Sequence, residues 1–238
     1  MIRDVGVTVA LHDRLPAWAS GPVSSLSVLG QPFAIVPALG SLYLADVVAT
    51  LRRDDCEPGE PLCSDRTAFI VATVLGGMAF GAALKSAFGM GRPPEDLHAV
   101  EESEYGFPSG HTLAATVFWG AIALWTSAGR RSARLAAAGL IVAAVAVSRM
   151  ALGVHYAVDV LASVVLGAAY LATVAWLTDG RPGRAFCVAV GVGLFAALTS
   201  RGNDRSRLAT AGTVTAAIGW RVSELRPVRR ALVRVASR

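Results

Sequence analysis

The sequence predicts an all-α membrane protein: a polytopic transmembrane bundle of about six to seven helices. It is 54% hydrophobic and 16% charged, with a mean hydropathy of +0.53, whereas about a quarter of the residues of a soluble domain are charged. The charges gather in short stretches between long uncharged runs, as in proteins that cross a membrane several times. With 238 residues, we expect residues 1–238 to form one integral-membrane domain, with a core of motifs at 66–178.

The apolar runs predict the individual spans. They lie at 32–51, 66–88, 109–127, 135–148, 155–178 and 185–200, and a weaker seventh run lies at 207–221. A span needs about 20 residues, with a lower limit near 17, so the fourth and seventh runs are short. Both are bounded by arginines, whose long side chains can reach the interface from a short segment. Residues 1–21 contain charges that interrupt a signal-peptide core, and we interpret them as an interfacial amphipathic segment.

The net charge of +5 does not indicate a nucleic-acid-binding protein. No basic stripe interleaved with aromatic residues is present, and basic loops beside membrane segments explain the excess. The three cysteines leave two alternatives open, because Cys56 and Cys63 share one loop and are either paired or free. No metal-ligand spacing occurs in the sequence, so we expect neither a metal nor another cofactor.

Three short stretches contain the residues that indicate chemistry. Lys85, the only lysine, opens the first stretch. The stretches are Lys85-x6-Arg92-Pro93, Pro108-Ser109-Gly110-His111 and Ser148-Arg149-x5-His155-x3-Asp159. Each lies at the end of a predicted span, and in an up-and-down bundle all of these ends fall on the same side of the membrane. We therefore expect them to form one site.

The residue types fit phosphoryl transfer, which needs positioning and neutralisation of the phosphate oxygens. Lys85, Arg92 and Arg149 supply positive charge, and arginine adds a planar fork that matches phosphate. Ser109 and Gly110 begin a helix, where unpaired amides and the helix dipole favour an anion.

The two histidines are candidates for the nucleophile and the acid. His155 and Asp159 are four residues apart, so on a helix they share a face and the carboxylate can orient the imidazole for attack. His111 can then protonate the leaving alkoxide. Each stretch alone has an ordinary structural explanation, and it is their conjunction on one face that indicates a catalytic site. The loop before Pro108 contains several acidic residues. We interpret it as a solvated loop, in preference to a gate of the site or a cation-binding site. Its acidic residues are Glu95, Asp96, Glu101, Glu102 and Glu104.

At these residues the sequence resembles the type 2 phosphatidate phosphatase superfamily, which includes vanadium-dependent haloperoxidases and glucose-6-phosphatase. All three signature stretches match in order, over about a third of the chain, from Lys85 to Asp159. The resemblance implies an α-helical core and a metal-independent phosphatase that passes through a phosphohistidine. It implies His155 as nucleophile, Asp159 as its orienting partner and His111 as general acid. The implied phosphate-binding residues are Lys85, Arg92, Ser109, Gly110 and Arg149.

The expected function is therefore hydrolysis of a lipid phosphate, either phosphatidate-like or an isoprenyl phosphate or pyrophosphate. Alternatives are a lipid phosphotransferase with the same intermediate, a haloperoxidase, and a non-catalytic anion transporter. The expected location is the cell membrane, with the site on the extracytoplasmic face. If all seven runs cross, the face opposite the motifs holds 14 of the 22 basic residues, in agreement with that orientation. If the seventh run does not cross, the six basic residues that follow Trp220 move to the face of the motifs, and the count then favours the opposite orientation. The lipid and the oligomeric state are not fixed by the sequence.

Overall fold

The computed structural model of the chain describes residues 5–53, 60–103, 105–200 and 203–236. Within them the regular secondary structure is helical, and the predicted all-α class is confirmed. Cys56 lies outside the described residues, and so does its alternative pairing with Cys63. The α-helices are α1 (Gly6–His12), α2 (Ser20–Ser27), α3 (Pro32–Leu51), α4 (Asp65–Phe88), α5 (Gly110–Trp125), α6 (Arg131–Ala151), α7 (Ala157–Thr178), α8 (Pro182–Thr199), α9 (Asp204–Ser223) and α10 (Arg226–Ala236).

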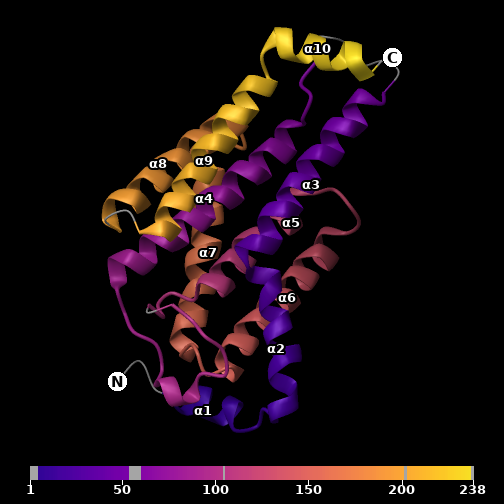
Figure 1. Cartoon of the computed structure of the whole chain (residues 1–238). Coiled ribbons are helices and arrows are strands. Elements are labelled where there is room, and N and C mark those ends of the chain that lie inside the picture. Colours follow the sequence, from indigo (N-terminus) through magenta and orange to yellow (C-terminus); the bar gives the residue numbers. More distant parts are fainter. Residues whose placement is uncertain (1–4, 54–59, 104, 201–202, 237–238) are drawn as a thin grey trace.

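The helices α3 to α9 form an elongated bundle around α4 and α5 (Figure 1). Helices α8 and α9 pack against α4, while α6 and α7 pack against α5. The short helix α1 lies at one end of the bundle, and α10 lies across the opposite end. The two ends of the molecule are therefore built from different parts of the chain.

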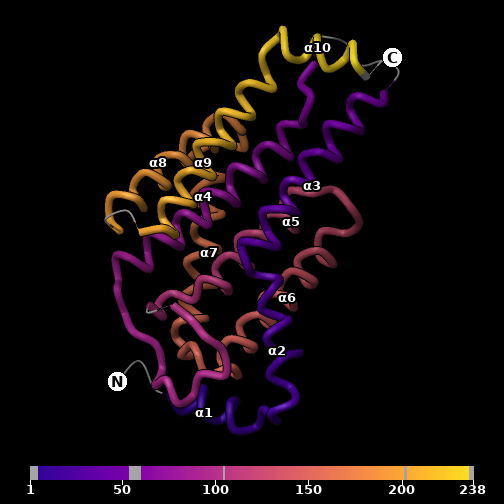
Figure 2. Tube along the Cα trace, in the orientation of Figure 1, coloured from indigo at the N-terminus to yellow at the C-terminus, as the bar shows by residue number. Residues whose placement is uncertain are grey.

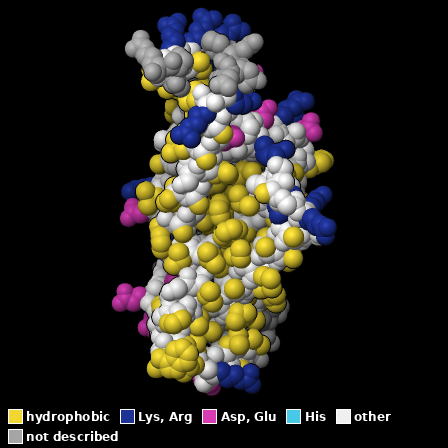
Figure 3. All heavy atoms as spheres, turned by 90° about the vertical axis from the view of Figure 1, so that its right-hand side faces the viewer, with side chains coloured by type: hydrophobic (Ala, Val, Ile, Leu, Met, Phe, Trp, Pro, Cys, Tyr) yellow, Lys and Arg dark blue, Asp and Glu magenta, His cyan; other side chains and the backbone are white. Residues whose placement is uncertain are grey.

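Among the described residues, five helices are long and apolar enough to cross a membrane: α3, α4, α6, α7 and α8. Helix α5 has 16 residues, about 24 Å of helix, which is shorter than the roughly 30 Å hydrocarbon core of a bilayer. Helix α9 has 20 residues but is less apolar. Hydrophobic side chains cover much of the face shown in Figure 3, between groups of Lys and Arg towards its ends, as expected for a surface that faces lipid.

Small residues let α4 sit at the centre of the bundle. An added Cβ at Gly77 would lie 2.6 Å from Val117 Cγ1, and one at Gly76 would lie 2.4 Å from the Tyr170 hydroxyl. Only glycine therefore permits α5 and α7 to approach α4 this closely, as the small-residue pattern of membrane helices leads one to expect. Helix α4 begins at the Ser64 cap, whose hydroxyl accepts the amide of Thr67, and ends at Gly89 with φ +55°.

Several predicted runs begin or end a few residues away from the observed helices: 185–200 corresponds to α8 (Pro182–Thr199), and 207–221 corresponds to α9 (Asp204–Ser223). The fourth and fifth runs differ in the same way. The fourth run was placed at 135–148, but α6 extends from Arg131 to Ala151. Arg134 is a helical residue of α6, and its guanidinium donates to the carbonyls of Ala123, Ala128 and Gly129. These bonds satisfy the charged group within the protein, so the helix can continue past it. The fifth run was placed from residue 155, but α7 begins at Ala157. Arginine ends an apolar run in the sequence without ending the helix.

The interfacial location of residues 1–21 stays a prediction. The structure adds that α1 and α2 pack against α6.

Candidate active site

The three stretches that carry the candidate residues meet at the end of the bundle where α1 lies. Lys85 is in the last turn of α4, Arg149 is in the last turn of α6, and α5 and α7 begin here. The loop between α4 and α5 passes over the same end (Figure 2). All of the residues singled out in the sequence lie in this region: Lys85, Arg92, Ser109, Gly110, His111, Arg149, His155 and Asp159.

His155 is fully buried and bonded on both sides of its ring. Its Nδ1 lies 3.4 Å from Asp159 Oδ2, and its Nε2 lies 3.1 Å from Arg92 Nη1. A guanidinium can only donate, so the network assigns the proton to Nδ1 and a lone pair to Nε2. Burial lowers the pKa of His155 well below its ordinary value, and the charges of Arg92, Lys85 and Arg149 lower it further. The imidazole is therefore neutral near pH 7, as a nucleophile must be.

The start of α7 explains how the carboxylate is held against the ring. Asp159 is the third residue of the helix, and its Oδ2 accepts the amide of Tyr156 at 3.0 Å. A carboxylate at this position commonly satisfies an amide that a helix start leaves unpaired. The sequence predicts that His155 and Asp159 share one face of a helix. Instead, His155 precedes α7, and the two side chains meet at the start of the helix. On the opposite side, the Thr8 hydroxyl of α1 donates to the carbonyl of His155 at 3.0 Å.

The three cations reach the site from different elements. Lys85 Nζ donates to the carbonyl of Tyr105 at 2.8 Å, and Arg92 Nη1 also donates to the carbonyl of Val154 at 2.8 Å. Arg149 is 2% exposed, and its Nη1 donates to the hydroxyl of Ser27 in α2. Its Nε is buried and has no hydrogen-bond partner among the described residues. That orphaned donor belongs to a group that the motifs assign to phosphate.

The interpretation of the acidic loop as solvated is wrong for Glu102, which belongs to the site and whose side chain is 14% exposed; Glu104 of the same loop lies outside the described residues. The carboxylate of Glu102 pairs with Arg92 Nη2 at 2.9 Å and also with Arg149 Nη2. Burial raises the pKa of Glu102, but Arg149 and Arg92 outweigh it and leave the pKa below its ordinary value. The carboxylate is thus ionised and bridges two arginines, and a phosphate that used the same donors would have to displace it. One signal in the sequence could have indicated this pairing. Three cations lie at the ends of membrane segments, and such charges are usually paired with a carboxylate, which a nearby loop could supply.

The start of α5 supplies the remaining candidates. Ser109 is the helix cap, fully buried, with its hydroxyl 3.0 Å from Thr112 Oγ1 and accepting the Thr112 amide. Its side chain therefore serves the helix, and the first amides of α5, those of Gly110 and His111, are left without intrahelical acceptors. A Cβ at Gly110 would lie 3.2 Å from Lys85 Cε, so glycine here lets the lysine approach the helix start closely.

His111 lies in the first turn of α5 and lines the same cavity as Lys85 and Glu102. The charges of Arg149, Glu102 and Lys85 act on its imidazole. The fold thus brings a second imidazole into the charged cluster around His155, with different neighbours: His155 is bonded to Asp159 and Arg92, whereas His111 faces the cavity.

Comparison with known proteins identifies this arrangement. The profile of the PAP2 superfamily matches residues 66–182, which include every candidate residue of the site. The chain belongs to the PAP2 superfamily. Its fold is that of membrane-spanning PAP2 proteins: it is similar to a solved structure described as the first transmembrane PAP2-type phosphatidylglycerolphosphate phosphatase from Bacillus subtilis. The TM-score is 0.61 at 21% sequence identity, over 74% of this chain and 84% of that one. Among curated proteins, none matches the chain.

Proposed function

We propose that this PAP2 protein is an integral-membrane lipid phosphate phosphatase. It hydrolyses a phosphate monoester or pyrophosphate of a phosphatidate-like or isoprenyl lipid, through a phosphohistidine and without a metal. The observation that carries this proposal is the neutral imidazole of His155, held between the Asp159 carboxylate and the Arg92 guanidinium. The site lies at the ends of membrane-spanning helices, where a lipid head group meets water.

In the first step, Nε2 of His155 attacks the phosphorus and the bond from phosphorus to the lipid oxygen breaks. The Nδ1–H···Asp159 hydrogen bond stabilises the cationic ring as the N–P bond forms. Arg92 transfers its donor from Nε2 to a phosphate oxygen, and Lys85 and Arg149 neutralise the others. His111 takes up a proton when the anionic phosphate enters, because the phosphate charge offsets the cations that surround the imidazole, and it then gives this proton to the departing oxygen. The lipid therefore leaves as a neutral alcohol or a lipid monophosphate.

In the second step, water attacks the phosphohistidine from the side that the lipid has left. His111 is now neutral and takes a proton from the water. The N–P bond breaks, inorganic phosphate is released, and His155 returns to its starting form. A hydrolase differs from a phosphotransferase only here, in whether water or another alcohol takes the phosphoryl group.

We further propose that the site faces the extracytoplasmic side. Four of the arginines that follow Trp220 lie in α10, the helix across the opposite end of the molecule from α1 (Figure 1). Basic residues beside membrane segments favour the cytoplasmic side, and this helix would place them there. Cysteine accessibility at the two ends in intact cells tests this orientation.

The test of the activity is phosphate release from a panel of lipid phosphates in proteoliposomes. The panel contains phosphatidate, an isoprenyl diphosphate and phosphatidylglycerophosphate, the last because the similar Bacillus subtilis protein is described as acting on it. We expect release that survives a chelator and is inhibited by vanadate, and an acid-labile phosphoenzyme with a labelled substrate. His155→Ala should abolish both while the thermal unfolding transition persists. Normal turnover by that variant would overturn the proposal, and transfer to an added alcohol without release of phosphate would identify a phosphotransferase.

A further inference from the structure

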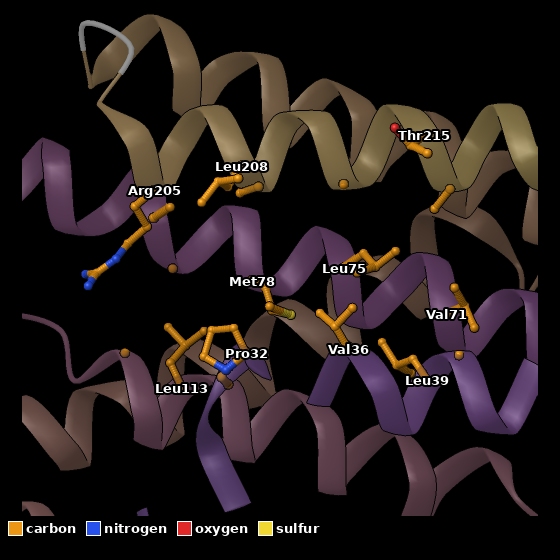
Figure 4. Close-up of a pocket in the computed structure, with 18 of the residues that line it drawn as sticks. Pro32, Val36, Leu39, Val71, Leu75, Met78, Leu113, Arg205, Leu208 and Thr215 are labelled. Atoms are coloured by element: carbon orange, nitrogen blue, oxygen red, sulfur yellow. The ribbon is translucent and has the colours of Figure 1, made fainter. Parts of the chain in front are cut away.

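An apolar groove leads from the site along the bundle. It has a volume of about 1030 Å³ and runs between α3 and α9 across α4 (Figure 4). Its walls include Val36 and Leu39 of α3, Leu75 and Met78 of α4, and Leu208 of α9. At one end the lining changes to residues of the site: Lys85, Glu102 and His111, with Gly110 beside them.

The wall formed by α9 is shaped by small residues. Ala209, Gly212, Ala216 and Gly219 line the groove at spacings of three and four, so they share one face of the helix. The lining residues of α9 extend from residue 205 to residue 223, about 27 Å at the helical rise. This is close to the roughly 30 Å thickness of the bilayer hydrocarbon, so an extended lipid chain fits the groove along its length. Helix α9 lies outside the residues that the family profile matches.

Arg205 stands where the groove meets the site. It is in the first turn of α9 and lines the groove, with its guanidinium at the end of the groove away from Thr215 and Val71 (Figure 4). Its charge acts on both Lys85 and Arg92.

Unlike the arginines inside the site, Arg205 has no carboxylate partner among the described residues. Arg92 and Arg149 share Glu102, and the nearby Arg207 pairs with Asp204 at 3.8 Å. Arg205 is thus a fourth cation on the groove side of the cluster, with its charge available to a ligand.

We propose that Arg205 binds a second phosphate of the substrate, the one that stays on the lipid, and that the groove holds the hydrocarbon chain attached to it. This inference rests on the proposed phosphatase function. The cations of the three motifs surround the phosphate that is transferred to His155, and a phosphate between that group and the chain would lie beside Arg205. The preferred substrate is then a lipid with two phosphates. This is either a diphosphate ester or a phosphodiester with a terminal phosphomonoester.

Arg205→Gln tests the charge, with Arg207→Gln as the matched control from the same helical turn. Phosphate release is measured from an isoprenyl diphosphate, from phosphatidylglycerophosphate and from phosphatidate, which has one phosphate. Because a hydrogen bond to a charged group is lost, we expect kcat/KM for one or both two-phosphate lipids to fall about tenfold to a hundredfold, mainly through KM. The lipid that shows this fall identifies the source of the second phosphate. Phosphatidate turnover should change less than about threefold, and the control should match the wild type.

Gly212→Leu tests the groove, because a Cβ at Gly212 meets no atom within 4 Å. The leucine would therefore enter the groove without a clash. KM for a long-chain two-phosphate lipid should rise several-fold, because the leucine removes packing contacts between the chain and α9, whereas a short-chain analogue should be unaffected. Gly191→Leu on α8 is the control, since it too has open space and does not line the groove.

The outcomes separate this inference from the proposed function. If His155→Ala abolishes turnover but Arg205→Gln lowers the one- and two-phosphate activities equally, or lowers neither, the second-phosphate site is wrong and the phosphatase stands. If Gly212→Leu acts equally on long and short chains, or on neither, the chain does not occupy the groove. If the wild type releases phosphate from no lipid in the panel, both proposals fail.

Discussion

Glu102→Gln should make the protein bind inorganic phosphate and vanadate more tightly. The carboxylate of Glu102 pairs with both Arg92 and Arg149, whose side chains are 5% and 2% exposed, while its own side chain is 14% exposed. An anion that uses these arginines must first displace it. Glutamine keeps the shape of the side chain and one acceptor oxygen but removes the charge, so it competes less well.

The size of the effect follows from the contacts that compete. A hydrogen bond to a charged group contributes about 1.5–3 kcal/mol, and the displaced carboxylate recovers part of this from water. Loss of one such contribution corresponds to about a tenfold to hundredfold decrease in the vanadate inhibition constant. Without an anion, the variant should unfold at a lower temperature, because two buried guanidinium groups lose their counter-ion. Added phosphate should raise its unfolding temperature more than that of the wild type.

The assay is vanadate inhibition of phosphate release, together with thermal unfolding in detergent with and without phosphate. Glu101→Gln is the control, because Glu101 is adjacent and exposed and forms none of these pairs. An inhibition constant in Glu102→Gln that equals or exceeds that of the wild type would refute the idea that the carboxylate occupies the anion site.

Three further outcomes are expected. Asp159→Asn should lower kcat by about 10²- to 10⁴-fold, because it removes the carboxylate that fixes the tautomer of His155. The unfolding temperature of the variant should change little. A near-normal kcat would contradict the role assigned to Asp159. Because the pKa of His155 is lowered well below 6.5, the neutral imidazole persists as the pH falls through that value, and a pH profile of kcat/KM should show no loss from this group until lower pH. Gly153→Ala should destabilise the protein severely, since φ there is +74° and the Cβ would lie 1.8 Å from the Leu97 carbonyl oxygen. The control is Gly129→Ala, at φ +68° in open space, which should lower the free energy of unfolding by only about 1 kcal/mol. Equal unfolding temperatures for the two variants would argue against this account.

The helical elements were predictable because apolar runs in lipid have few alternatives. A backbone that crosses hydrocarbon must satisfy its own hydrogen bonds, so a long apolar run becomes a helix. The runs at 32–51 and 66–88 accordingly match α3 and α4 almost to the residue. The ends of α6 were missed for a related reason: Arg134 and Arg149 lower the local hydropathy, yet both are helical and bonded within the protein.

The site was only partly predictable, because its charge pairing depends on contacts between distant residues. The three motifs could be assigned to one end of a bundle from their positions in the runs. Glu102 could not, since it is 10 residues from Arg92 and 47 from Arg149, and in sequence it resembles the other acidic residues of its loop. Arg205 was likewise inconspicuous among the arginines, because only the packing of α9 against α4 carries it to the mouth of the groove.

The charges of the site explain why a resident carboxylate and a phosphate can exchange. With Lys85 protonated, the three motif cations exceed the carboxylates of Glu102 and Asp159 by one unit. A phosphate monoester has a charge near −2 at neutral pH, so replacing Glu102 by phosphate brings the same cluster close to neutrality. Uncompensated charge in a site of low dielectric is costly, which favours the exchange once a lipid phosphate arrives. A second phosphate would make the cluster negative, and Arg205 is the cation positioned to offset it.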